Sequence, residues 1–168
     1  VLFLTRDELL EQISMMRPRF TDYQSFAEAK LSDIFTEDEL KDAKIYKATE
    51  LKTSLFSLNA EGKYESKPLP SMVQSSPIFA FQMADVNADG HLDIVMAGNI
   101  NHAKLRIGKM DANYGLLLLG DGQLNFNLVP QRKSGFWLKG DVRSMLKVDD
   151  QWYFGINSFG VESYKLQK

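Results

Sequence analysis

The spacing of hydrophobic residues changes near residue 45. Before that point they recur at the three- and four-residue intervals of a helix face, in two runs: Leu9, Leu10, Ile13, Met16, and then Tyr23, Ala27, Leu31, Ile34. Pro18 lies between the runs and separates two helices. We therefore expect residues 1–44 to form a helical segment, either an insertion in the region that follows or a lead-in to it.

Three short motifs in this segment predict where its helices begin. Thr5–Glu8, Thr21–Gln24 and Thr36–Glu39 each place a threonine three residues before Glu or Gln, the pattern of a capping box. The acidic run Glu37–Glu39 suggests acid–base chemistry at first sight. Negative charge is favoured at a helix N-terminus, however, and that explanation suffices.

From residue 45 to residue 168 the hydrophobic period falls towards two, which predicts a mainly β region. The expected strands are short and regularly spaced: 53–58, 63–65, 77–83, 92–97, 114–119, 125–129, 136–138, 142–148, 151–155, 161–166. Turn sequences such as Asn59–Gly62 and Asp121-Gly122 separate them.

An internal repeat runs through this region at an offset of about 56 to 62 residues. Leu55–Pro70 resembles Leu116–Pro130, and Ile94–Asn99 resembles Trp152–Asn157. We also align the strand Phe79–Asp85 with 135–141, and we interpret 101–114 as an inserted loop. Such a unit predicts a stacked array of antiparallel four-stranded sheets, in which each sheet needs neighbours to cover its faces.

Composition narrows the function classes. A net charge of −2 with scattered Lys and Arg argues against nucleic-acid binding, and the longest apolar run, Leu116–Leu119, is too short to span a membrane. The chain has no cysteine, which excludes disulfides and thiolate metal sites. It begins Val1-Leu-Phe-Leu4, without the basic region of a signal peptide, and we interpret it as a piece of a longer protein.

One motif carries specific chemistry. Asp85, Asn87, Asp89 and Asp93 occupy positions 1, 3, 5 and 9 of a loop whose sixth residue is glycine. Calcium takes six to eight oxygen ligands, and a loop with this spacing supplies them from alternate side chains and a backbone carbonyl. We predict a calcium site formed by these four side chains and the carbonyl of His91.

The loop is not an EF-hand. Its twelfth position is Met96 rather than Glu, and a β-type sequence follows it instead of a helix. A metal-free Asp/Asn-rich hairpin turn is the alternative interpretation. With metal bound, we expect the ion to brace the connection between strands, because no neighbouring residue is placed for catalysis.

The Asp85–Asp93 loop, the preceding strand Phe79–Met83 and the following Ala97-Gly98-Asn99 resemble an FG-GAP or VCBS-type repeat of bacterial surface proteins. The resemblance covers roughly residues 50–168. It implies a β-propeller, calcium in the blade loops, an extracellular, cell-surface or periplasmic location, and adhesion or ligand binding rather than catalysis.

The chain departs from that family pattern. The loop aligned with the calcium loop begins at Asp141 and lacks acidic ligands, so we expect no metal there. Two to three blades cannot close a ring, and we expect the remaining blades of a longer chain, or a partner chain, to cover the sheet edges.

The remaining residues that could carry chemistry do not form a catalytic motif. His91 and His102 are the only histidines, and no catalytic motif accompanies either. The basic loop 101–109 is a solvated connection or faces a ligand. Aromatic residues are dense after Tyr114; core packing accounts for most, and a few could stack on a sugar or a peptide.

Three functions follow as hypotheses. The first is a non-catalytic calcium-binding interaction or adhesion module whose protein or glycan ligand is unknown. The alternative is a hydrolase or lyase acting on polysaccharide with structural calcium, for which we find no acid–base constellation. The third is a spacer between blades.

Overall fold

The computed structural model describes residues 4–165, so the predictions that touch Val1–Phe3 and Leu166 lie outside it. The chain divides into two compact units, Val1–Thr49 and Glu50–Lys168. The last helix of the first unit ends at Leu40, and the first strand of the second unit begins at Ser54. The predicted boundary at residue 44 falls in the connection between these two elements.

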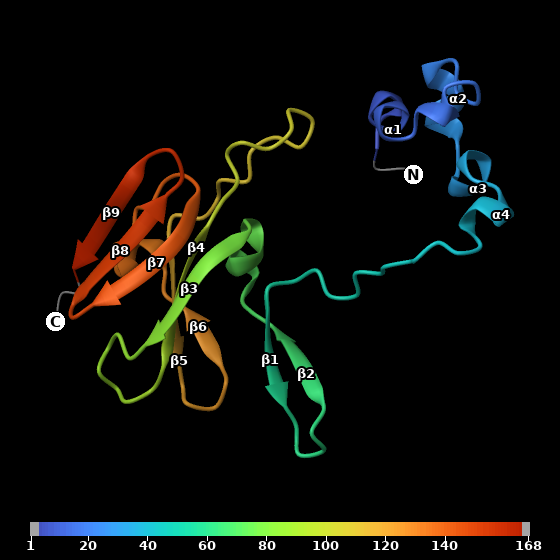
Figure 1. Cartoon of the computed structure of the whole chain (residues 1–168). Helices are drawn as coiled ribbons and strands as arrows, with labels where there is room; N and C mark the ends of the chain where they lie inside the picture. The colour runs from blue at the N-terminus through green and yellow to red at the C-terminus, as the bar shows by residue number, and fades with distance from the viewer. Residues whose placement is uncertain (1–3, 166–168) are drawn as a thin grey trace. The chain divides into compact units, whose positions relative to one another are not determined.

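The first unit is a set of short helices (Figure 1). Their bounds are α1 Arg6–Gln12, the 3-10 helix η1 Ser14–Met16, α2 Tyr23–Glu28, α3 Leu31–Ile34 and α4 Glu37–Leu40. They enclose a small core made of Leu9, Leu10, Met16, Phe20, Phe26 and Ile34.

Two of the three predicted helix starts are confirmed. Thr5 and Thr36 each accept a hydrogen bond from the amide three residues on, and the carboxylates of Glu8 and Glu39 each accept one from the threonine amide. The prediction for Thr21 is wrong. Asp22 caps α2 instead, because its carboxylate accepts the Ser25 amide at 2.8 Å.

The second predicted hydrophobic run does not form one helix face. Ala29 and Lys30 are extended, and the Asp33 side chain accepts the Lys30 amide at 2.8 Å to start α3. This local bond competes with helix continuation. Phe26 and Ile34 are consequently buried, while Leu31 is 54 % exposed.

An ion pair in this unit should make it acid-sensitive. Bidentate hydrogen bonding by Arg19, at 3.1 and 2.9 Å, lowers the pKa of Glu39 from 4.5 to about 2, with help from the Thr36 amide. Because the folded-state pKa is depressed, this stabilisation is present above the unfolded value and is lost as the pH falls from 4.5 to about 2. In a ¹³C NMR titration, Arg19→Gln should return the Glu39 midpoint towards 4.5; an unchanged midpoint would refute the assigned cause.

The second unit is mainly β and contains three antiparallel sheets (Figure 1). The first pairs β1 Ser54–Leu58 with β2 Tyr64–Pro68. The second has the order β3 Ile78–Ala84, β4 Asp93–Gly98, β5 Leu116–Gly120, β6 Phe126–Leu128, and the third has β7 Val142–Val148, β8 Gln151–Ile156, β9 Gly160–Lys165. Two short helices, η2 Ser71–Ser75 and α5 Gln131–Ser134, connect sheets.

The hairpins β1–β2 and β5–β6 repeat the same local structure. Asn59 and Asp121 begin the two turns, and the side-chain oxygen of each accepts two amides of its own turn. A proline and a short helix follow each hairpin. The predicted correspondence of Leu55–Pro70 with Leu116–Pro130 therefore has a structural counterpart.

The strands after each hairpin also correspond. A register shift interrupts β3–β4 pairing near its start and β7–β8 pairing at the same place. At the far end, the Asn99 amide donates to the Pro77 carbonyl at 3.0 Å, and the Asn157 amide donates to the Asp141 carbonyl at 2.9 Å. Pro77 and Asp141 thus occupy equivalent positions, each immediately before its strand.

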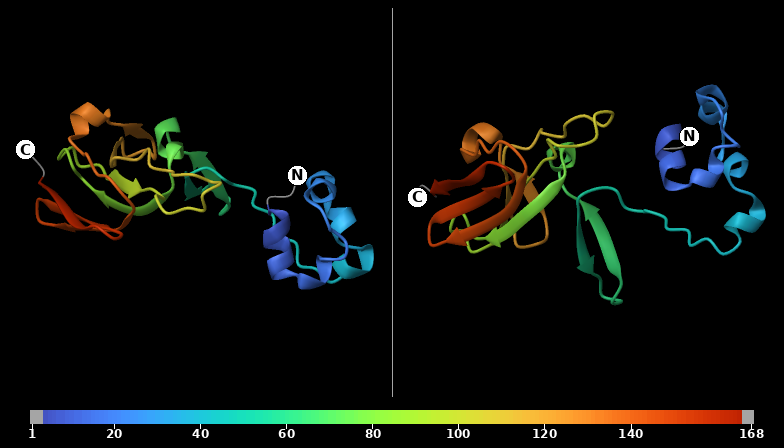
Figure 2. Two further views of the ribbon diagram at one scale, coloured as in Figure 1. Left: turned by 90° about the horizontal axis from the view of Figure 1, so that it is seen from above. Right: turned by 45° about the horizontal axis from the view of Figure 1, so that its top comes forward.

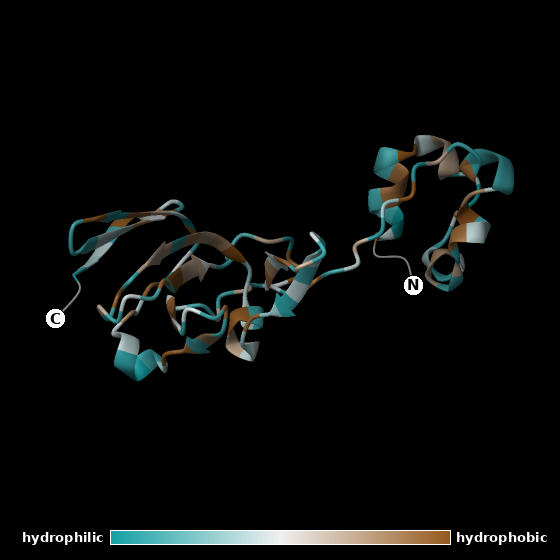
Figure 3. Cartoon of the chain, turned by 90° about the horizontal axis from the view of Figure 1, so that it is seen from below, coloured by the Kyte–Doolittle hydropathy of each residue, from teal (hydrophilic) through white to brown (hydrophobic). Residues whose placement is uncertain are grey.

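The largest core lies between the second and third sheets, where β3 runs beside β7 (Figure 2). Its members are Ala80, Val95, Ala97, Leu117, Phe136, Leu138, Val142, Trp152, Phe154 and Ile156. The opposite face of the second sheet packs on Val73 and Leu69. In Figure 3, brown hydrophobic stretches alternate with white and teal ones along strands of the second unit.

Two further predictions need correction. Residues 136–138 are not a strand: Phe136 and Leu138 are buried and Trp137 is exposed, an alternation that imitates a strand in a connection between sheets. The alignment of 79–85 with 135–141 is also wrong, because β3 corresponds to β7.

The architecture is therefore mainly β with three antiparallel sheets and a few short helices. One sheet has the four strands expected of a blade, the others have two and three, and no closed sheet occurs among residues 4–165. The propeller-like array stays a prediction. None of the helices within that range is long and apolar enough to cross a membrane.

Candidate functional site

The predicted calcium loop connects β3 to β4 and is held by its own side chains. Asp85 accepts the amides of Asp89 and Gly90 at 3.2 and 2.9 Å, and Asn87 Oδ1 accepts the Asp89 amide at 3.1 Å. Asp89 accepts the His91 amide at 2.8 Å. Three of the predicted side-chain ligands therefore belong to one compact, solvent-exposed turn.

Asp93 differs from the other three because it is completely buried. One carboxylate oxygen accepts the Val86 amide and the other accepts the Gly120 amide, both at 2.9 Å. The side chain thus joins the two ends of the loop and also attaches them to the end of β5. This bridging role was not predicted from the sequence.

Hydrogen bonding favours the charged form of Asp89. The His91 amide, together with the Asn87 side chain, lowers the pKa of Asp89 below its ordinary value. The His91 ring packs on the β5–β6 turn, where a Cβ at Gly122 would lie 2.6 Å from Nδ1. His91 therefore presents its backbone, not its imidazole, to the loop's chemistry.

The donor set suits a hard cation. Carboxylate, amide and backbone oxygens are the ligands of calcium, and each carboxylate oxygen has a second lone pair besides the one facing an amide. Within residues 4–165, no three His, Cys, Asp or Glu side chains are gathered as a metal-holding group. Asn87 Nδ2 donates to Asp89 at 2.8 Å, so these two ligands now bind each other.

Asp141 does not occupy the position predicted for it. It precedes β7, whereas Asp85 follows β3, and the connection equivalent to the calcium loop is the two-residue turn Asp149-Asp150. That turn has no room for a nine-residue ligand loop. The expectation of one candidate loop in this chain is unchanged, but its reason is loop length rather than ligand loss.

A buried polar group was overlooked in the sequence. Asn99, 1 % exposed, accepts Ser76 Oγ at 2.7 Å and the Asn113 amide at 3.0 Å. Its Nδ2 donates to the carbonyls of Asn113 and Gly140 at 2.7 and 3.1 Å. Asn99 therefore fastens both ends of the inserted loop to the start of the third sheet.

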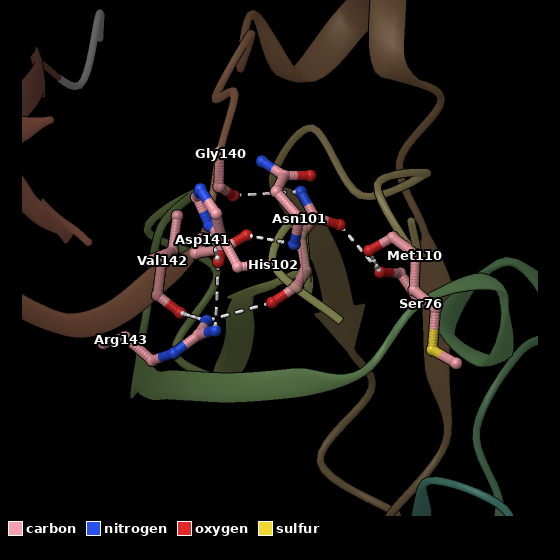
Figure 4. Close-up of polar contacts among 9 residues, drawn as sticks. Ser76, Asn101, His102, Met110, Gly140, Asp141, Val142 and Arg143 are labelled. Carbon is pink, nitrogen blue, oxygen red and sulfur yellow. Dashed lines mark hydrogen bonds and ion pairs between the residues drawn. The ribbon is translucent and has the colours of Figure 1, made fainter. Parts of the chain in front are cut away.

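Asp141 anchors the same loop from the other side (Figure 4). This carboxylate is 3 % exposed, accepts the Asn101 amide at 2.6 Å, and lies 3.4 Å from both Arg143 and His102. Arg143 also donates to the Asn99 carbonyl at 2.9 Å. One feature of the sequence could have indicated this anchor: Asn99 and Asn157 occupy equivalent positions, directly after β4 and β8.

Comparison with known proteins does not assign the chain to a family. The chain matches no protein-family model, no curated protein and no solved structure. The likeness to FG-GAP or VCBS repeats therefore stays a prediction based on the residues quoted for it.

Proposed function

We propose that this chain is a calcium-binding β-repeat module that mediates interaction or adhesion in an exported protein and performs no catalysis. The observation that carries the proposal is the ligand spacing of the loop, in which Asp85, Asn87 and Asp89 belong to one exposed hydrogen-bonded turn and Asp93 fixes its ends. Three carboxylates close in sequence repel one another, and a divalent cation offsets that repulsion.

Calcium would brace the β3–β4 connection. Asp93 already fixes the loop ends, so binding needs only the exposed side chains to reorient, with the Asn87–Asp89 hydrogen bond opening. The ion then supplies positive charge that stabilises the turn, and the adjoining sheets supply the interaction surface.

The exposed surface of β3 supports an interaction role. Phe79, Phe81 and Met83 lie on one side of the strand and are 47, 65 and 43 % exposed. Contiguous exposed apolar side chains mark contact surfaces. In this proposal the remaining blades of a longer chain, or a partner chain, cover them, in an extracellular, cell-surface or periplasmic setting.

Isothermal titration with calcium tests the proposal. We expect one site with a Kd on the order of 0.1–1 mM, the range of extracellular modules. Asp89→Ala should abolish binding, because it removes a ligand from the exposed part of the turn.

Asp121→Ala is the matched control. Asp121 accepts amides of its own turn as the loop aspartates do, but it belongs to the β5–β6 hairpin. Calcium binding should survive this change. Absence of heat from the unmodified chain at millimolar calcium, or equal binding by Asp89→Ala, would refute the calcium claim.

A further inference from the structure

A hollow of the β unit lies beside the third sheet, away from the calcium loop. Its volume is about 680 Å³, and its lining combines aromatic and polar side chains, among them Asn101, Trp137, Asp141, Phe159 and Glu162. This combination of ring faces and hydrogen-bonding groups is typical of a small-ligand site.

The aromatic wall is exposed yet held in place. Trp137 is 58 % exposed and stacks on Tyr114, with ring centroids 4.8 Å apart. Its backbone amide donates to the Tyr164 hydroxyl at 3.2 Å. Phe159, at 76 % exposure, lines the same hollow from the β8–β9 turn. A ring fixed as Trp137 is offers flat apolar contact at little entropic cost.

The polar floor contains an acceptor without a donor. Asn101 Oδ1 is buried and accepts no hydrogen bond within the described part of the chain. The Asn101 amide donates to the buried Asp141, which fixes this segment against β7. A buried acceptor without a partner is costly, and a rotation of the Asn101 side chain that brings Oδ1 to the hollow would let a ligand hydroxyl satisfy it.

The charges around the hollow balance. Asp141 and Glu162 are opposed by Lys139 and by Arg143, which lies 3.4 Å from Asp141. Balanced charge gives no advantage to a polyanion or a polycation. Lys139 Nζ lies 5.5 Å from the Trp137 ring centroid, and its flexible chain can leave that ring face when a neutral ligand stacks there.

We infer that this hollow binds a neutral saccharide, with Trp137 and Phe159 against its C–H faces and Asn101 Oδ1 accepting a hydroxyl. The inference rests on the proposed interaction function, whose ligand class it names, but it does not depend on the calcium loop.

Calorimetric titration of the whole chain with cellohexaose, maltohexaose and chitohexaose, each to about 10 mM so that a millimolar site saturates, tests it. At least one should bind saturably. Trp137→Ala should weaken that binding about tenfold or more, Trp137→Phe less, and Asn101→Leu by about fivefold for one lost hydrogen bond. Phe56→Ala, an exposed phenylalanine of β1 outside the hollow, is the control and should bind normally.

Failure to bind any of the three saccharides would overturn the inference, as would binding that both Trp137 variants and Asn101→Leu leave unchanged. Binding of a trilysine peptide in place of the saccharides would also overturn it, in favour of a cationic peptide. Calcium binding is measured separately, so loss of the calcium site with saccharide binding intact would contradict only the calcium proposal.

Discussion

Asn99→Ala is expected to destabilise the β unit by about 3–5 kcal/mol. The change removes four buried hydrogen bonds, to Ser76, Asn113 twice and Gly140, and leaves their partners without replacements. It also places alanine at a φ of +97°, a conformation that a Cβ disfavours. Both tryptophans of the chain belong to this unit, so urea unfolding followed by tryptophan fluorescence measures the change.

Two controls separate the causes. Asn99→Gly relieves the backbone strain but loses the same four bonds, so it should recover only part of the loss. Asn157→Ala changes the exposed residue at the equivalent strand end and should alter stability by less than about 0.5 kcal/mol. If Asn99→Ala cost no more than Asn157→Ala, Asn99 would not be the anchor of the inserted loop.

Asp93→Ala is expected to cost about 2–4 kcal/mol without any metal present. Its carboxylate is the acceptor for the half-buried amide of Val86 and the buried amide of Gly120, and both would lose their partner. The same urea unfolding, performed in a calcium chelator, measures this structural contribution alone.

Asp89→Ala serves as the matched loop variant. Asp89 is exposed and bonds only within the turn, so in chelator its replacement should cost far less than Asp93→Ala. Equal losses in the two variants would contradict the division of the loop into a buried anchor and an exposed ligand set.

The sequence predicted the strands well because their alternation and turn residues are local signals. The hairpin turns at Asn59 and Asp121 form through side-chain bonds to their own backbone, and both were foreseen. Residues 136–138 were wrongly predicted as a strand, because buried and exposed side chains alternate in this connection between sheets as they do in a strand. Only long-range pairing separates the two cases, and pairing is not visible in a single sequence.

The candidate site was foreseen in part for the same reason. The exposed turn Asp85–Asp89 follows from local spacing, whereas the burial of Asp93 depends on Gly120, which arrives with the neighbouring strand. Asp141 and Arg143 form an ion pair that no sequence motif predicts. The pair depends on the tertiary packing of β7 beside β3, which a single sequence does not show.

Calcium titration followed by amide NMR tests the central claim most directly, because it locates the ion as well as detecting it. We predict that the amide resonances of residues 85–93 shift together and saturate, while those of the turn 59–63, in which Asn59 likewise accepts amides of its own turn, stay in place. Absence of a saturable shift in residues 85–93, or an equal shift in both turns, would contradict the proposal that this loop binds calcium.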